Sequence, residues 1–251
     1  MGSDRREREA AILDQLAKDG RIQVSTIAND LGVSEVTVRA TLRELESQGL
    51  LRRTHGGAVP SSIHHVLARR NQQADAKERI AKAAAALVRD GDHLMIEAGT
   101  TTALVPRFLT GKRDIHIVTN STLVVNYARV NPELHVTLTG GAFHRESESM
   151  VGAVARASIA RFNARLAFVG TDGLRADRGL TTQFAEGADI ITAMHANASA
   201  TWLLTDATKY GRAGFVNVLA VDELAGIITD TELDPDAAQL LQDHGVSLRA
   251  V

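Results

Sequence analysis

Two apolar helical stripes meet at a glycine turn near residue 32, and this arrangement strongly limits how the first part of the chain can fold. Val24, Ile27 and Leu31 recur at the spacing i, i+3 and i+7, and Gly32 with Val33 supplies a tight turn. The stretch that follows, SEVTVRATLREL, starts with a serine in position to cap a further helix. A short helix, a tight turn and a second amphipathic helix are typical of a helix-turn-helix.

The helix after the turn is predicted to have one apolar face and one polar face. Val38, Leu42 and Leu45 form an i, i+4, i+7 stripe that we expect to pack inward. The arginines at positions 39 and 43 then project from the other faces, and the hydroxyls at 34 and 37 lie at the start of the helix. These are the groups that a helix offers to phosphates and base edges.

The segments on either side complete a winged helix-turn-helix over residues 1–60. A first helix is predicted from Arg5 to Lys18, because Ile12, Leu13 and Leu16 mark one face. After the third helix, LLRRTHGGAV has two short β-like pieces around a Gly-Gly turn, as in a wing. In this fold the third helix enters the major groove. We therefore expect eight DNA-binding residues: Ser34, Glu35, Thr37, Arg39, Arg43, Arg52, Arg53 and His55. From helix spacing alone, a three-helix protein-binding module is the alternative.

Composition narrows the partners that such a chain can have. The 251 residues include 28 basic and 30 acidic side chains. Any contact with nucleic acid must therefore depend on a local group of basic residues rather than on an overall positive charge. The absence of cysteine excludes a disulfide scaffold and a cysteine nucleophile. The nine histidines show no metal-binding spacing, so we expect neither a metal nor a cofactor. The charged N-terminus and the lack of a long apolar run indicate a cytoplasmic protein without a membrane partner.

The rest of the chain is predicted to be a separate α/β domain. Residues 61–76 are polar and contain two serines after Pro60, so we interpret them as a linker. From residue 77 to residue 251, helical segments such as ERIAKAAAALV and TALVPRFL alternate with extended ones such as HLMIEA, IHIVTN, WLLTD, NVLAV and GIITD. This alternation indicates a mostly parallel sheet with helices on both faces.

Several loops that follow the predicted strands have the chemistry of an anion site. EAGTTT, TNS, TGG, GTDG, GLTT and TDATKYGR each end or follow a strand. In open parallel sheets, ligands bind where the carboxyl ends of strands meet loops. A phosphorylated sugar needs N–H and hydroxyl donors, one or two cations, and acceptors for its hydroxyls. A glycine turn capped by a threonine explains EAGTTT equally well, so the prediction depends on the loops converging.

Both parts of the chain resemble the DeoR family of bacterial transcription regulators. The run GRIQVSTIANDLGVSEVTVRATLRELESQGLLRRTHGGAV resembles the family's DNA-binding segment, and the loops beyond residue 77 resemble its sensor domain, which is similar in fold to ribose-5-phosphate isomerase. The resemblance implies an α/β fold with an N-terminal winged helix-turn-helix and a mostly parallel sensor domain. It also implies an effector pocket lined by Gly99, Thr100, Thr101, Asn120, Gly141, Arg145, Asp172, Glu186 and Lys209.

The chain departs from the family pattern at three places. Ala40 and Thr41 stand where Arg-Asp is common, which implies the loss of a phosphate contact and of an internal charged partner. Glu97-Ala98 replaces the usual Asp-Ser, and Ile191 stands where a lysine is frequent. The last difference implies an effector pocket with one cation fewer.

The resemblance implies a repressor that binds double-stranded operator DNA and releases it when a phosphorylated sugar binds. A homodimer or homotetramer is expected, because paired half-sites increase specificity. Two alternatives remain open: an isomerase-like enzyme that uses Asp172, Glu186 and Lys209, and a DNA-binding protein whose second domain only assembles subunits. The choice between repression and activation, and the identity of the sugar, are left open by the sequence.

Overall fold

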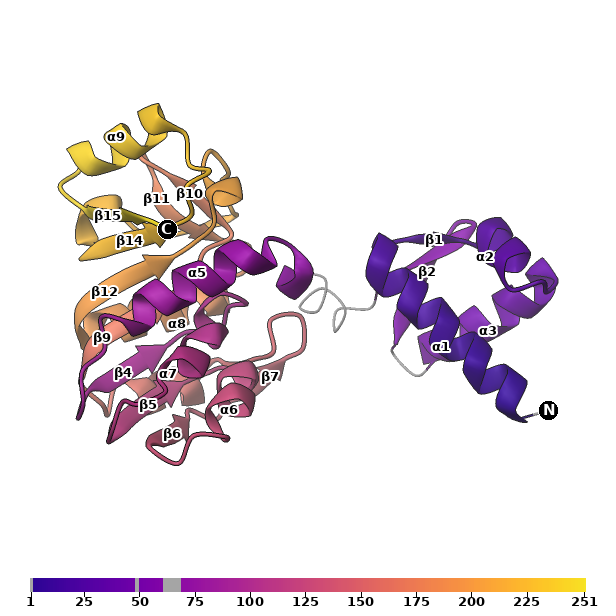
Figure 1. The fold of residues 1–251 in the computed structure, drawn as a ribbon, viewed down its shortest axis with the longest axis horizontal. Coiled ribbons are helices and arrows are strands. Elements are labelled where there is room, and N and C mark those ends of the chain that lie inside the picture. Colours follow the sequence, from indigo (N-terminus) through magenta and orange to yellow (C-terminus); the bar gives the residue numbers. More distant parts are fainter. Residues whose placement is uncertain (1, 48–49, 61–68) are drawn as a thin grey trace. The chain divides into compact units, whose positions relative to one another are not determined.

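The computed structural model describes residues 2–47, 50–60 and 69–251, and it consists of two compact units, Met1–Gln72 and Gln73–Val251 (Figure 1). Half of the predicted linker, residues 61–68, lies outside the described residues. Residues 69–71 are helical, and helix α5 (Ala74–Ala85) begins inside the predicted linker. Its start was missed because the polar run NQQADAK has no apolar periodicity.

The first unit contains the three predicted helices and the predicted wing. The helices are α1 (Gly2–Asp19), α2 (Val24–Asp30) and α3 (Glu35–Ser47). The wing strands β2 (Leu51–Thr54) and β3 (Gly57–Pro60) pair antiparallel, and a short strand β1 (Ile22–Gln23), which we did not predict, pairs with β3. The winged helix-turn-helix is thereby confirmed.

The core of this unit is made by the apolar stripes seen in the sequence. Val38, Leu42 and Leu45 of α3 are buried, and they pack with Ile12 and Leu16 of α1. Each such side chain contributes roughly 1.5–3 kcal/mol when it leaves water. The buried stripe of α3 therefore fixes which of its residues face solvent.

Two local features join the elements of the first unit. Ser34 caps α3 by accepting a hydrogen bond from the Thr37 N–H at 3.1 Å, as predicted. Gly57 pairs with Gln23 across β1 and β3, and a Cβ at this position would lie 2.0 Å from the Ile22 carbonyl oxygen. Glycine is therefore required where the wing meets β1.

The second unit is built on one seven-stranded sheet in the order β15-β14-β12-β9-β4-β5-β6, and every neighbouring pair is parallel. Its strands in chain order are β4 (His93–Ile96), β5 (Ile115–Thr119), β6 (Leu134–Leu138), β9 (Ala164–Val169), β12 (Ala198–Leu204), β14 (Gly226–Thr229) and β15 (Ser247–Ala250). Because the strands are parallel, their carboxyl ends meet at one edge of the sheet.

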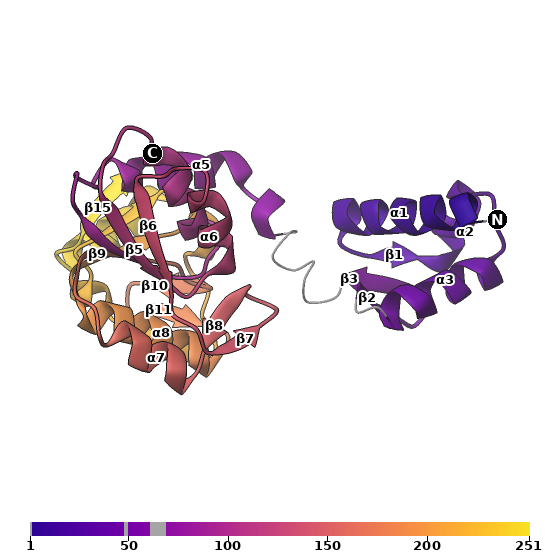
Figure 2. The same ribbon diagram turned by 90° about the horizontal axis from the view of Figure 1, so that it is seen from below.

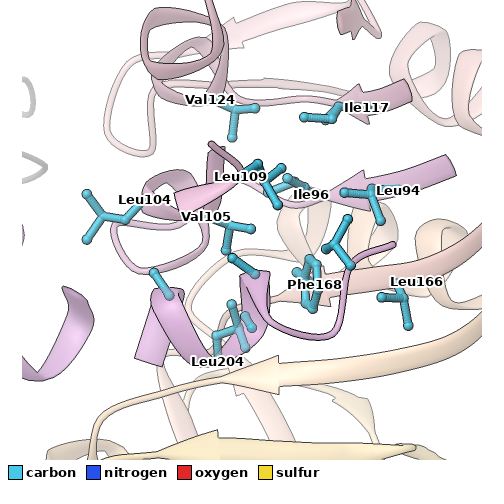
Figure 3. Close-up of a cluster of buried hydrophobic side chains, with 14 of the residues drawn as sticks. Leu94, Ile96, Leu104, Val105, Leu109, Ile117, Val124, Leu166, Phe168 and Leu204 are labelled. Atoms are coloured by element: carbon cyan, nitrogen blue, oxygen red, sulfur yellow. The ribbon is translucent and has the colours of Figure 1, made fainter. Parts of the chain in front are cut away.

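Helices cover both faces of this sheet, as predicted. One face carries α5, the 3₁₀ helix η1 (Thr102–Phe108) and α6 (Thr122–Ala128), and the other carries α7 (Ala153–Ile159), α8 (Ala185–Ala196) and α9 (Pro235–Asp243). Figure 2 shows α5 and α6 on one side of the strands and α7 and α8 on the other. Residues of β4 alternate between the faces: Leu94 and Ile96 pack with Phe168 and Val105 in the first cluster (Figure 3), and Met95 packs in the second.

Several elements differ from the sequence prediction. TALVPRFL forms a 3₁₀ helix rather than an α-helix, and it contains Pro106. The strand predicted at NVLAV is β13 (Val216–Leu219), which belongs to a small antiparallel sheet with β10 (Gly173–Arg175) and β11 (Gly179–Thr182) rather than to the main sheet. The hairpin β7 (Ala142–His144) and β8 (Ser149–Val151) was not predicted either. Two further 3₁₀ turns are η2 (Ala207–Lys209) and η3 (Val221–Glu223).

Candidate functional sites

The solvent face of α3 carries the residues expected to bind DNA. Arg39 and Arg43 are exposed, and the Arg39 guanidinium lies 3.0 Å from the Glu35 carboxylate one turn earlier. Val36, which the sequence analysis did not select, is 72% exposed on the same face. An exposed β-branched residue near the start of this helix is a signal that an apolar contact is available there.

The wing lies beside α3 and is fastened to it by an ion pair. The Arg53 guanidinium donates to the Glu46 carboxylate at 2.6 Å, and the Arg53 backbone N–H donates to the same carboxylate at 2.8 Å. These hydrogen bonds from Arg53 lower the pKa of Glu46. Arg53 therefore has a structural partner in addition to its predicted contact with DNA, whereas Arg52 and His55 are exposed on the wing.

A groove of about 360 Å³ runs between α3 and the wing. It is lined by polar and charged side chains over an apolar base, and three of the predicted residues, Arg39, Arg53 and His55, lie along it. Helix α3 and the wing thus present donors around one concave surface. The described residues that line it are Val24, Arg39, Leu42, Glu46, Arg53, Thr54, His55 and Gly57.

Thr41 is buried at 4% exposure in contact with α1. The Arg8 guanidinium donates to the Thr41 hydroxyl at 3.1 Å, and this hydroxyl lies 3.1 Å from the Thr37 carbonyl oxygen. Thr41 therefore gives Arg8 a neutral acceptor at the position where the resemblance implied the loss of a charged partner.

At the carboxyl edge of the main sheet, two loops predicted to bind the effector are joined by hydrogen bonds. The Asn120 side chain, after β5, accepts from the Ala98 N–H at 3.0 Å and donates to the Met150 carbonyl at 3.2 Å. The Thr102 hydroxyl donates to the Glu97 carbonyl at 2.7 Å. The loop of Gly99, Thr100 and Thr101 is therefore held between β4, β5 and the β7–β8 hairpin.

The loop that follows β9 is hydrogen-bonded to the end of β4. The Glu97 carboxylate accepts from the Gly170 N–H at 3.1 Å, which joins the end of β4 to the end of β9. Two residues later, the Asp172 carboxylate accepts from the Gln183 N–H at 3.0 Å. Asp172 therefore lies in the turn between β9 and the small antiparallel sheet.

The loop of Lys209 is fixed by two buried carboxylates that the sequence analysis did not select. Asp206 accepts from the Thr208 N–H at 3.2 Å, and Asp230, at the end of β14, accepts from the Ala207 N–H at 2.8 Å. Both carboxylates are nearly inaccessible to solvent. The signal was present in the sequence, because WLLTD and GIITD each end a predicted strand with aspartate.

Arg145 and Glu186 have exposed side chains on two elements that meet through an aromatic stack. The His144 ring, in β7, lies 4.5 Å from the Phe184 ring at the N-cap of α8, with the planes 12° apart. Arg145 and Glu186 thus flank this contact in the sequence. Gly141 has φ +114°, and a Cβ there would lie 2.6 Å from the Val151 carbonyl, so tight backbone packing accounts for this glycine.

Two further residues, on helices α8 and α5, are buried. Ile191, in α8, is 1% exposed and packs in an apolar cluster with Leu203 and Ile227, so an apolar side chain fills the position where the resemblance implied a lysine. Lys77 is buried in α5, on the stripe that continues with Ile80.

The chain matches two known protein-family models, which together cover most of its length. Residues 8–63 match the DeoR-like helix-turn-helix domain, and residues 72–231 match the DeoR C terminal sensor domain. The chain belongs to the DeoR family of transcriptional regulators. Among the described residues, none of the helices is both long and apolar enough to pass through a bilayer.

Relatives of this DeoR-family chain extend over its full length. The HTH-type transcriptional regulator GlpR of Haloferax volcanii is 35% identical, and the match covers 96% of each chain. The glycerol-3-phosphate regulon repressor of Escherichia coli is 28% identical over 96% of this chain and 97% of the relative. Ribose 5-phosphate isomerase A of Methanocaldococcus jannaschii is similar in structure, with 19% identity, a TM-score of 0.39 and 55% of each chain covered.

One prediction about the histidines is wrong. The sequence spacing indicated no carboxylate-histidine constellation, but Asp114, His116 and His135 come together at the surface, with their potential ligand atoms within 4.8 Å of one another. His116 and His135 are neighbours because β5 and β6 pair in register. Cross-strand register cannot be read from the spacing of residues along one chain.

Proposed function

We propose that this transcriptional regulator reads its operator with the exposed face of α3 in the major groove and with the wing against the adjacent backbone. The observation that carries the proposal is the shared surface of α3 and the wing, which displays Arg39 and His55 around one groove. Arg39 and Arg43 supply the charged donors, and Val36 supplies an apolar contact suited to a thymine methyl group. Ser34, Thr37 and Arg52 contribute contacts to phosphates.

The experiment for DNA binding is selection of operator sequences from random duplexes by the purified full-length protein, followed by mobility-shift titration. A preferred sequence with repeated half-sites supports the proposal, including the expected dimer or tetramer. Equal affinity for all duplexes at physiological salt would contradict it, because a specific protein binds its site 10³–10⁷-fold more tightly, in rough terms, than random DNA.

The effector site belongs to the carboxyl edge of the main sheet, and its ligand is a phosphorylated sugar or polyol. The loop at Gly99–Thr101 supplies backbone N–H groups and hydroxyls for the phosphate, and Lys209 and Arg145 supply cations. Asp172 and Glu186 supply carboxylates for the ligand hydroxyls. The name of one relative, the glycerol-3-phosphate regulon repressor, supports a small phosphorylated polyol as the class of ligand.

Asn120 and Glu97 have a different role in this proposal. Each already bonds a backbone N–H of a neighbouring loop, at 3.0 and 3.1 Å respectively. They therefore hold the loops in a preformed arrangement, which reduces the ordering cost of binding. Binding of the effector lowers the affinity for the operator, so the protein acts as a repressor that is released by its ligand.

The test of the effector site is thermal unfolding of the full-length protein in a panel of sugar and polyol phosphates. A ligand at 100 times its dissociation constant stabilises the domain that binds it by about 2.7 kcal/mol. The corresponding unphosphorylated sugars are the matched controls. Stabilisation by none of the phosphorylated compounds, or equal stabilisation by the unphosphorylated ones, would contradict the proposed class of effector.

A further inference from the structure

A ladder of three histidines lies on the main sheet at the ends of the strands remote from the effector edge. His93, His116 and His135 occupy matching positions on β4, β5 and β6, which pair in parallel register. Neighbouring rings are stacked, with centroids 5.1 Å apart for His93 and His116 and 4.8 Å apart for His116 and His135. β4, β5 and β6 lie side by side in Figure 1. Sheet pairing thus collects imidazoles that are far apart in the sequence.

A carboxylate completes the cluster. The Asp114 carboxylate oxygen lies 3.1 Å from His116 Nε2 and 3.7 Å from His135 Nε2. Asp114 precedes β5 and has φ +53°, a conformation that aspartate tolerates better than most residues. Its backbone N–H donates to the Glu133 carboxylate at 3.3 Å. One oxygen and two nitrogens therefore converge on one small volume at the surface.

The charges around this volume favour a cation. Arg113, the nearest basic residue in sequence, pairs with Asp90 at 3.1 Å, and Arg165 pairs with the Asp92 carboxylate. Glu133 and Asp114 add negative charge beside the rings. Arg113 and Arg165 are therefore each engaged by a carboxylate outside the cluster.

We propose that Asp114, His116 and His135 form a binding site for a divalent transition-metal ion, with Zn²⁺ as the representative. Imidazole and carboxylate are the donors that zinc, copper, nickel and cobalt accept, whereas Mg²⁺ and Ca²⁺ prefer oxygen alone. Tetrahedral zinc with bonds of about 2.1 Å needs ligand atoms roughly 3.4 Å apart. The two separations from the Asp114 oxygen, 3.1 and 3.7 Å, bracket this value, and the ligand atoms of the two histidines lie within 4.8 Å of each other, so side-chain rotations can bring all three onto one ion.

The fourth coordination position is open to solvent, and His93, stacked on His116, is the nearest further imidazole of the ladder. The ion would join β5 to β6, which is an edge strand of the sheet. It would thereby stabilise the folded sensor domain in proportion to its occupancy.

The test is isothermal titration of the untagged, full-length protein with ZnCl₂ at pH 7.5, with thermal unfolding as a second readout. We expect one saturable site and a rise in the unfolding temperature that EDTA reverses. The double variant His116→Gln with His135→Gln should lose at least tenfold in affinity, and Asp114→Asn should lose less. MgCl₂ should give neither signal.

Matched controls separate this cluster from the other histidines. The double variant His64→Gln with His65→Gln, and the single variant His244→Gln at an exposed position on the C-cap of α9, should bind zinc like the parent. If the double variant in the ladder is poorly folded, His135→Gln alone on the edge strand gives the same comparison. Absence of saturable zinc binding, or binding that is lost in the His64/His65 variant and kept in the ladder variants, would overturn the proposal.

Discussion

Arg53 of the wing and Glu46 of α3 are joined twice, once through the guanidinium at 2.6 Å and once through the backbone N–H at 2.8 Å. The wing is therefore attached to the helix that we expect to read DNA. An arginine on a wing is ordinarily interpreted as a phosphate contact, but this one also holds the wing against α3.

The first prediction concerns this attachment and its dependence on pH. Because the pKa of Glu46 is lowered in the folded state by Arg53, the pair stabilises the domain above the unfolded pKa near 4.5. That contribution is lost as the pH falls through the lower, folded pKa. Glu46→Gln should therefore lower the unfolding temperature at pH 7, and the difference from the parent should vanish at strongly acidic pH. A difference that is the same at every pH would contradict the role given to the carboxylate.

A second prediction concerns Thr41 and its partner Arg8. Thr41→Val removes the acceptor from the Arg8 guanidinium at a buried position, so it should cost about 1–2 kcal/mol of stability. Thr41→Asp restores a charged acceptor and should be at least as stable as the parent. Denaturant unfolding of the parent and the two variants measures the order of their stabilities. If the valine variant matches the parent, the hydrogen bond at 3.1 Å contributes nothing to stability.

A third prediction tests the face of α3. Arg39→Ala should weaken operator binding by about 1–3 kcal/mol if the contact is bidentate to guanine. Arg43→Ala should weaken binding more evenly across sequences, as expected of a phosphate contact. Arg21→Ala, an exposed arginine before α2, is the matched control. Mobility-shift titrations at one fixed salt concentration measure the operator affinity of each variant, and circular dichroism verifies that each is folded. Unchanged affinity for both α3 variants would contradict the proposal that this helix reads the operator.

A fourth prediction is that the protein does not interconvert aldose and ketose phosphates. The relatives are named as regulators, and the proposed pocket serves binding. Purified protein incubated with ribose 5-phosphate should give no conversion above the buffer rate. Conversion that disappears in Glu186→Gln would establish an enzyme in this domain instead.

The sequence predicted the first unit better than the second, and the reason is the range of the interactions. The stripes of Val38, Leu42 and Leu45, and the cap at Ser34, are set by residues within two turns of a helix, so spacing along the chain was enough. The main sheet was also predictable, because its buried strands are separate apolar runs.

The site residues were harder to predict because their partners lie far away in the sequence. Glu97 meets Gly170, Asp230 meets Ala207, and His116 meets His135 only after the strands pair. The burial of Ile191 of α8 in an apolar cluster with Leu203 and Ile227 likewise depends on strands that are distant in the sequence. The cross-strand register that decides these contacts is a property of the folded sheet.

The last prediction concerns Lys209, which follows β12 in a loop fixed by Asp206 and Asp230. A charge-assisted contact with the effector contributes roughly 1.5–3 kcal/mol, so its loss should reduce effector affinity by about one to two decades. Lys209→Ala belongs to the sensor domain, and it should bind the operator with the affinity of the parent. Lys112→Ala, another lysine of the same domain, is the matched control.

The most direct measurement is operator affinity by fluorescence anisotropy, with the parent, Lys209→Ala and Lys112→Ala each titrated with the best ligand from the thermal panel. The proposed function predicts that the parent and Lys112→Ala release DNA at the same ligand concentration, and that Lys209→Ala needs at least tenfold more. Release of all three proteins at one ligand concentration would contradict the effector site at the carboxyl edge of the sheet.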